Sequence, residues 1–323
     1  MAIALGTLAY LAASVGLSLG LLALIWLADR YEREPPWMVL LATFWGAVPA
    51  ILLSCVAEMV FNVPLSRVFG QEPAQVIGTV LLAPVLEEVA KGLALLLVVV
   101  LVRHEFDDVL DGMVYGAAVG LGFSFVEDFI YFFGATAHGG LAEGGLTFLM
   151  RNLGFILNHS LFTSLTGIGF GIARVYHRSF LARFGWPLAG LMAAIALHSL
   201  HNALSLLSLP GFFAALLLHW GAGIALLVLI PFLWEAEKRW IIAGLREEIS
   251  EGRIPGEALK VLPFAGSLGG KLPLGARQKR ALCADLVELA FHRRASDEAW
   301  DESVGTELEA LRRRIAGRVG PRS

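Results

Sequence analysis

Long runs of apolar residues, separated by short polar segments, dominate the first 234 residues of the chain. A helix needs about 20 mostly apolar residues to cross the hydrocarbon core of a bilayer. Seven runs reach roughly that length, and we expect each of them to form a membrane-spanning helix. They cover residues 3–27, 38–60, 76–102, 112–133, 148–173, 186–208 and 212–234. The first run lacks a basic leading segment, so we expect a retained helix rather than a secretory signal.

Composition supports a polytopic membrane protein. Of the 323 residues, 57% are hydrophobic and 16% are charged, whereas a soluble domain is about 45–50% apolar and about 25% charged. The fold class that we predict is therefore all-α, with about seven transmembrane helices. Two cysteines, Cys55 and Cys283, are too few for a disulfide scaffold or a thiolate metal cluster. A formal net charge of −3 gives no indication of a nucleic-acid partner.

The charged residues divide the chain into two parts. Only 9 of the 25 Lys and Arg residues, and 14 of the 28 Asp and Glu residues, precede residue 235. We therefore expect a transmembrane domain over 1–234 and a charged tail over 235–323. Glycines and prolines over 261–275 predict a linker in the tail. Apolar spacing predicts an amphipathic helix over 276–291, and a second is expected over 297–317.

Basic residues in the connections predict the orientation in the membrane. Cytoplasmic loops are enriched in Lys and Arg. The connections after the odd-numbered runs are together the richer ones, whereas the connection after the second run carries only Arg67 and those after the fourth and sixth carry none. The basic residues in the richer connections are Arg30, Arg33, Arg103, Arg174, Arg178 and Arg183. The N-terminus is therefore expected outside a cell membrane, with the tail in the cytoplasm, where it is available for a partner or for self-association.

The third run carries three ionisable side chains, Glu87, Glu88 and Lys91. A charge at the middle of a bilayer costs at least about 2.5–3.5 kcal/mol, so such residues usually face the protein interior and serve function. Helical spacing places Glu87 and Lys91 on one face, and Glu88 is three residues from Lys91. A buried ion pair accounts for one glutamate but leaves the second unexplained. Pro84, one turn upstream, is expected to loosen the helix.

The fourth run contains a glycine spacing and a pair of acids. Glycines at 112, 116 and 120 line one helical face, which predicts close packing against another helix. Asp111 precedes them and fits the N-cap of the same helix. Glu127 and Asp128 lie near the outer end of this run. We expect Glu127 to be functional, while Asp128 is the weaker candidate of the two.

Two histidines come from two further runs. His159 lies in the fifth run, and the sixth contains His198-Ser-Leu-His201-Asn202. His198 and Asn202 share a face, whereas His201 points away from it. Counted at about 1.5 Å per residue, these groups lie at depths similar to those of Glu87 and Glu127, between the outer half and the middle of the bilayer. Other ionisable residues lack such neighbours and are expected to be structural or interfacial; they are Glu58, His138, Arg151 and His219.

Glutamates, histidines and an amide that converge on a water molecule can hydrolyse a peptide bond. A buried carboxylate serves as the general base, and an amide can donate a hydrogen bond to an oxyanion. The same donors suit Zn²⁺, although the HExxH pattern is absent. Two other classes stay open. Intramembrane carboxylates and histidines also serve proton- or ion-coupled transporters, although the hydropathy pattern has no internal repeat. A non-catalytic membrane scaffold is the third class.

The order of these motifs resembles the PrsW family of intramembrane proteases, which is related to CAAX prenyl proteases and bacteriocin-processing enzymes. The motifs are Glu87-Glu88-x-x-Lys91, Asp111-Gly-x-x-Tyr-Gly, Phe123-x-x-x-Glu127, His159 and His198-x-x-x-Asn202. The resemblance covers roughly residues 35–235 and not the tail. Where such proteins commonly have Glu-Asn, this chain has Glu127-Asp128. The role of the second position is therefore open.

The resemblance implies an endopeptidase that cuts a membrane-anchored protein, such as an anti-sigma factor, on its extracytoplasmic side. It implies that Glu87 activates the water, and that Glu88, Glu127 and His159 complete or position the site. His198 and Asn202 would bind the oxyanion, with Lys91, Asp111 and Asp128 in support. If a metal is present, the expected ligands are His159, His198 and Glu127. Zn²⁺-dependent and metal-free glutamate mechanisms both stay open.

Overall fold

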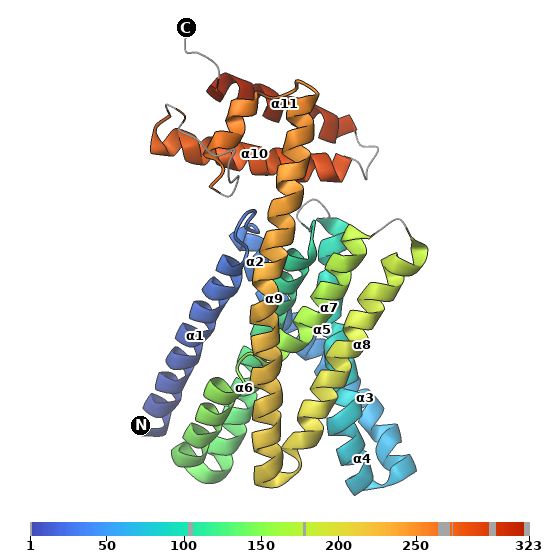
Figure 1. Ribbon diagram of the computed structural model, residues 1–323. Helices are drawn as coiled ribbons and strands as arrows, with labels where there is room; N and C mark the ends of the chain where they lie inside the picture. The colour runs from blue at the N-terminus through green and yellow to red at the C-terminus, as the bar shows by residue number, and fades with distance from the viewer. Residues whose placement is uncertain are drawn as a thin grey trace. The chain divides into compact units, whose positions relative to one another are not determined.

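The computed structural model describes residues 2–102, 106–176, 179–263, 272, 274–296 and 302–319. These residues form helices and connecting segments, and no strand occurs among them. The α-helices, labelled in Figure 1, are α1 (Ala2–Ala28), α2 (Pro36–Trp45), α3 (Ile51–Phe69), α4 (Gln71–Ile77), α5 (Ala83–Leu101), α6 (Val109–Leu149), α7 (Asn158–Val175), α8 (Phe180–Ser205), α9 (Ser208–Ser250), α10 (Ala276–Ser296) and α11 (Glu302–Val319). The all-α fold class is therefore confirmed.

In the part of the chain that the structure describes, three short π-helical segments adjoin the α-helices of the first 234 residues. They are η1 (Gly46–Ala50), η2 (Gly78–Leu82) and η4 (Met150–Gly154), and a 3₁₀ segment, η5 (Gly256–Val261), follows α9. Single π-helical turns within α-helices are frequent at functional sites. Here η2 leads directly into α5, and η4 precedes α7 by three residues.

Among the described residues, five helical stretches are long and apolar enough to cross a membrane. They are Leu5–Ala28, Pro36–Phe69, Val109–Val175, Phe180–Ser205 and Ser208–Ser250. The protein is therefore multi-pass, but the number seven is not confirmed. Two of the predicted runs, 112–133 and 148–173, lie within the single stretch Val109–Val175. The run predicted over 76–102 contains α5 and is not one of the five.

The chain reverses direction inside α6. Gly140 has a φ of +75°, which glycine tolerates because it has no Cβ. The ring of Tyr10 on α1 lies 5.0 Å from both Phe132 and Phe148, which precede and follow Gly140. The two parts of α6 therefore fold back on each other as a helical hairpin.

Glycines hold α6 against α7, as their spacing predicts. A Cβ added to Gly112 would lie 2.1 Å from the carbonyl oxygen of Gly167, and one added to Gly116 would lie 2.6 Å from that of Thr163. A Cβ on Gly120 would lie 2.2 Å from the carbonyl oxygen of His159. The two backbones are therefore in direct contact along three turns, and this contact determines where α7 places His159.

The prediction that Asp111 caps α6 is wrong by one turn. The N-cap is Asp108, whose Oδ1 accepts hydrogen bonds from the backbone N–H groups of Leu110 and Asp111. Asp111 occupies the third helical position, and its Oδ2 accepts from the backbone N–H of Asp108 at 2.8 Å. The pair forms a capping box, in which two acids satisfy the free N–H groups reciprocally. The spacing alone does not distinguish which of the two acids stands first.

Contacts divide the chain into two compact units. The first comprises Met1–Asp29 and Arg33–Ile230, and the second comprises Arg30–Glu32 and Pro231–Ser323. In the second unit, the C-terminal part of α9 packs with α10 and α11 around a core that includes Leu245, Leu286 and Leu311. The buried Glu248 carboxylate of this unit binds three guanidinium groups, from Arg253, Arg293 and Arg312.

The two helices predicted in the tail are present with different bounds. The first extends from Ala276 to Ser296, five residues longer than expected, and the second ends at Val319. Residues 297–301 of the predicted second helix lie outside the described residues. So do most of the predicted linker, including Gly266, Gly269, Gly270 and Pro273, and two arginines used for the orientation, Arg103 and Arg178.

Candidate active site

One turn of α5 provides the centre of a buried polar cluster. Glu87, Glu88 and Lys91 are 7%, 0% and 0% exposed. The Lys91 ammonium lies 2.6 Å from Oε1 of Glu88 and 3.5 Å from Oε2 of Glu87. Pro84 lies in the first turn of this helix, where its missing N–H costs little. The two glutamates are therefore not equivalent, because Glu88 holds the ammonium more closely than Glu87 does.

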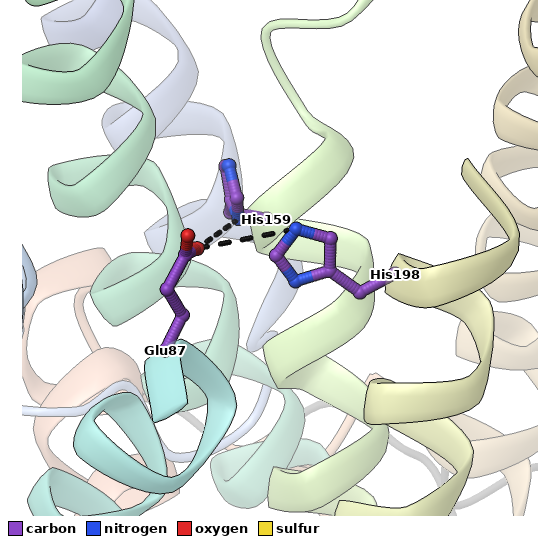
Figure 2. Close-up of side chains that lie close together, drawn as sticks. All are labelled: Glu87, His159 and His198. Carbon is purple, nitrogen blue, oxygen red and sulfur yellow. Dashed lines mark ion pairs between the residues drawn. The ribbon is translucent and has the colours of Figure 1, made fainter. Parts of the chain in front are cut away.

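Two histidines from other helices face Glu87. His159 lies in the first turn of α7 and His198 lies on α8. Figure 2 shows the three side chains pointing toward one another. Oε2 of Glu87 lies 3.9 Å from Nδ1 of His159 and 3.9 Å from Nε2 of His198. These separations are too long for hydrogen bonds. The same oxygen is buried and has no hydrogen-bond partner among the residues that the structure describes.

The other nitrogen of each histidine contacts a second carboxylate. Nδ1 of His198 lies 3.0 Å from Oε1 of Glu88, and Nε2 of His159 lies 2.9 Å from Oε2 of Glu127. Nδ1 of His159 lies 2.8 Å from the Lys91 ammonium, which can only donate. His159 therefore accepts at Nδ1 and donates at Nε2. Since Glu88 also holds Lys91 and accepts from Thr163, His198 donates at Nδ1 and has a lone pair at Nε2.

Arg151 completes the cluster, although its sequence context predicts a structural or interfacial role. Arg151 binds Glu127 through a terminal guanidinium nitrogen, and its Nε lies 2.5 Å from Oδ1 of Asp128. Tyr131 lies under the same guanidinium group, 4.1 Å from the ring centroid. One signal was present in the sequence, because Arg151 is the only Lys or Arg between residues 104 and 173. Two adjacent acids lie in the same apolar stretch, and Arg151 is the cation that pairs with both of them among the described residues.

Three other predicted residues lie apart from Glu87. The Asn202 amide donates to the backbone oxygen of Thr79 at 2.9 Å rather than to the cluster. Asp111 serves the capping box described above and joins none of these contacts among the described residues. Asp128 contacts Arg151 and not a histidine. His201 is buried, with its ring 4.9 Å from Phe155 and 5.9 Å from Phe162.

A cavity of about 860 Å³ adjoins the cluster. Glu87, Glu127, His159 and His198 line it, and so does Asn202. The lining also includes polar and acidic groups of α3 and α4, among them Cys55, Glu58, Asn62, Ser66, Gln71, Glu72 and Gln75. The cavity is large enough to admit a short segment of polypeptide beside Glu87.

The residues present fit a divalent metal ion. Glu87, His159 and His198 each offer one ligand atom, and these atoms lie within 4.8 Å of one another. The observation that most favours an ion there is that Oε2 of Glu87 is buried and accepts no hydrogen bond among the described residues. The carboxylates behind the two histidines match the arrangement that orients metal-binding imidazoles in proteins. The sequence predicted His159, His198 and Glu127 as metal ligands. In the structure Glu87, rather than Glu127, faces Nδ1 of His159 and Nε2 of His198, because Glu127 binds the far side of the His159 ring.

Comparisons with known proteins identify the family of the chain. The model of the family described as "PrsW family intramembrane metalloprotease" matches residues 34–235. Protease PrsW of Geobacillus kaustophilus is 31% identical over 169 residues, which are 51% of this chain and 66% of that protein, just under two thirds of its length. Protease PrsW of Bacillus subtilis is 30% identical over 197 residues, 60% of this chain and 81% of that protein.

A third relative, Protease PrsW of Oceanobacillus iheyensis, is 26% identical over 52% of this chain and 71% of its own length. No solved structure matches the chain. The family match covers well over half of the chain and includes every member of the buried cluster. The chain therefore belongs to the PrsW family of intramembrane proteases.

Proposed function

We propose that this protein is an endopeptidase that hydrolyses a peptide bond of a membrane-anchored protein, with Glu87 as the residue that activates water. The observation that carries the proposal is Oε2 of Glu87, which accepts no hydrogen bond among the described residues and lies buried between two histidines at the wall of the cavity. A carboxylate oxygen without a hydrogen-bond donor is ready to accept a proton from water.

The neighbours of Glu87 have distinct roles in this proposal. Lys91 balances the charge of the two glutamates, and Glu88 and Glu127 hold the imidazole rings. His198 presents a lone pair rather than an N–H toward Glu87. It is therefore better suited to accept from water or to bind a metal than to donate to an oxyanion. Asn202 lines the cavity, but its amide already donates to Thr79.

A divalent ion is compatible with the same residues. Glu87, His159 and His198 would hold it, and it would supply Lewis-acid activation of water and of the peptide carbonyl. Lys91 now donates to Nδ1 of His159, so this hydrogen bond would have to be given up. Glu88 and Glu127 would keep the rings oriented as they do here.

The substrate is proposed to be cut on the extracytoplasmic side. The support is the distribution of basic residues, which favours a cytoplasmic tail, and the position of the cavity. Its lining includes the last turn of α3, the start of α4 and the end of α8, which lie at the same end of the first unit as the start of α1 (Figure 1). We propose an anti-sigma factor as the substrate, as the resemblance implies.

The test compares Glu87→Gln with wild type. Full-length protein in detergent would be incubated with dye-quenched casein, and its metal content measured with and without chelator. The expected result is cleavage by wild type, loss of cleavage in Glu87→Gln and unchanged melting temperature. Glu143→Gln is the matched control, because Glu143 is exposed and does not line the cavity. Full activity in Glu87→Gln would overturn the assignment and favour a carrier or a scaffold.

A further inference from the structure

Arg151 joins two acids of α6 to the segment that precedes α7. It lies in η4, eight residues before His159, and its side chain is 23% exposed. The guanidinium group binds Glu127 and Asp128 and covers the ring of Tyr131. These three partners lie within about one helical turn of α6, so one rigid, planar cation spans all of them.

The contact with Glu127 continues directly to His159. Oε2 of Glu127 is the atom that binds Arg151, and the same atom accepts from Nε2 of His159 at 2.9 Å. On the far side of the ring, Nδ1 of His159 accepts from Lys91 at 2.8 Å. The imidazole of His159 therefore has a fixed partner on each side. One is the Glu127 carboxylate, which Arg151 holds in place, and the other is the Lys91 ammonium.

Charge explains why the arginine is needed there. Glu127 and Asp128 are adjacent acids on a membrane helix, and Arg151 is the cation bound to both of them among the described residues. Without it, the two carboxylates would repel each other. Glu127, which lines the cavity and is 20% exposed, would turn toward water. His159 would then lose the partner that holds its Nε2–H.

We propose that Arg151 is a positioning residue for the peptidase reaction, acting through Glu127 on the orientation of His159. This inference rests on the proposed function. Arg151 does not contact Glu87 or His198 among the described residues, so it is not itself one of the reacting groups. It also lines the cavity, so direct substrate binding is the alternative that the experiment must separate.

The kinetic test is a double-mutant cycle on dye-quenched casein. Arg151→Gln is expected to lower kcat by about 10–100-fold, the usual effect of removing a residue that orients a functional histidine, with KM nearly unchanged. Arg151→Lys should recover part of this loss. Because both residues act on the same hydrogen bond, the double variant Arg151→Gln/Glu127→Gln should be no slower than Glu127→Gln alone.

The matched control is Arg174→Gln. The Arg174 side chain is also 23% exposed and also pairs with an acid, Asp107, but it does not line the cavity. It should leave kcat within about twofold of wild type. Losses that multiply in the double variant, or a change in KM alone, would overturn the proposal in favour of substrate binding. An equal loss of kcat in Arg174→Gln would overturn it in favour of a general effect on folding.

A second readout does not need catalysis. In protein labelled with ¹⁵N-histidine, the Nε2–H of His159 bonded to a carboxylate should give a slowly exchanging proton signal, assigned by its absence in His159→Asn. The signal should persist in Arg174→Gln and disappear in Arg151→Gln. Persistence in Arg151→Gln would refute the positioning role even if wild type proved to have no peptidase activity. Inactive wild-type protein would by itself count against the proposed function only.

Discussion

Oε1 of Glu88 accepts a hydrogen bond from Nδ1 of His198 at 3.0 Å, although 110 residues separate the two along the chain. The contact ties α5 to α8 and leaves the lone pair of Nε2 directed toward Glu87. Glu88 thus determines which nitrogen of His198 is available to water or to a metal.

Removing the charge of Glu88 should affect both activity and stability. In Glu88→Gln, Lys91 loses its nearest carboxylate, and breaking a buried ion pair in this way costs about 3–5 kcal/mol. We expect a lower melting temperature in detergent and a fall in casein cleavage of about 10–100-fold. Glu143→Gln again serves as the control. A Glu88→Gln variant with both the stability and the activity of wild type would show that His198 is oriented by other contacts.

The glycine contact between α6 and α7 predicts an effect of a single methyl group. In Gly120→Ala the added Cβ would lie 2.2 Å from the carbonyl oxygen of His159, so the two helices must separate. Since His159 moves with α7, casein cleavage should fall by at least about tenfold, because small misplacements of catalytic groups have large effects. Gly134→Ala is the matched control, because nothing lies within 4 Å of a Cβ at that position. Equal activities of the two variants would contradict the packing argument.

Asn202 is predicted to matter less than the histidines. Its amide donates to the backbone oxygen of Thr79 in η2, so Asn202→Ala should mainly loosen α8 from that segment. We expect less than about a tenfold fall in kcat, whereas loss of an oxyanion donor typically costs about 10²–10³. His198→Ala, measured beside it, should be close to inactive. A kcat for Asn202→Ala as low as that of His198→Ala would restore the oxyanion role that the family resemblance implies.

The two cysteines provide a test of orientation. Cys55 lies on the cavity wall, whereas Cys283 lies in the second unit, where burial raises the pKa of its thiol and slows its reaction. A charged methanethiosulfonate reagent that does not cross membranes, added to intact cells, should label Cys55. The Cys55→Ser variant should stay unlabelled. Labelling that appears only after the cells are opened would reverse the proposed orientation.

The sequence predicted much of the cluster because charges in apolar runs are conspicuous. Glu87, Glu88, Glu127, His159 and His198 all meet at one place, and each of them interrupts an apolar stretch. Helical spacing alone also predicted the glycine contact, since residues four apart share a face. These features depend on local position along single helices, and local position is what a sequence displays most directly.

Pairings between helices were harder to predict. The sequence contains Arg151 and its two acids, but their contact depends on the reversal at Gly140, which brings a later part of the chain back beside the earlier one. Asn202 shares a helical face with His198. Its amide nevertheless donates to the backbone oxygen of Thr79, in a π-helical turn, and not to the cluster. The sequence predicted Glu127 as the carboxylate that joins the two histidines in holding a metal, whereas the structure has Glu87 in that place. This difference likewise depends on the rotation of each imidazole ring, which residue spacing does not determine.

The complete enclosure of Lys91 has a consequence for the medium in which the protein works. The side chains of Lys91 and Glu88 are both 0% exposed, and the Lys91 ammonium lies 4.1 Å from the centroid of the Phe123 ring, so the ion pair between them is out of contact with the surrounding solution. Mobile ions weaken charge interactions only where they can enter, over a Debye length of about 8 Å at physiological ionic strength. The attraction between Lys91 and Glu88 should therefore be nearly the same at low and at high salt concentration. Arg151, at the cavity wall, is within reach of salt, so it is the contact through which ionic strength would act on this site.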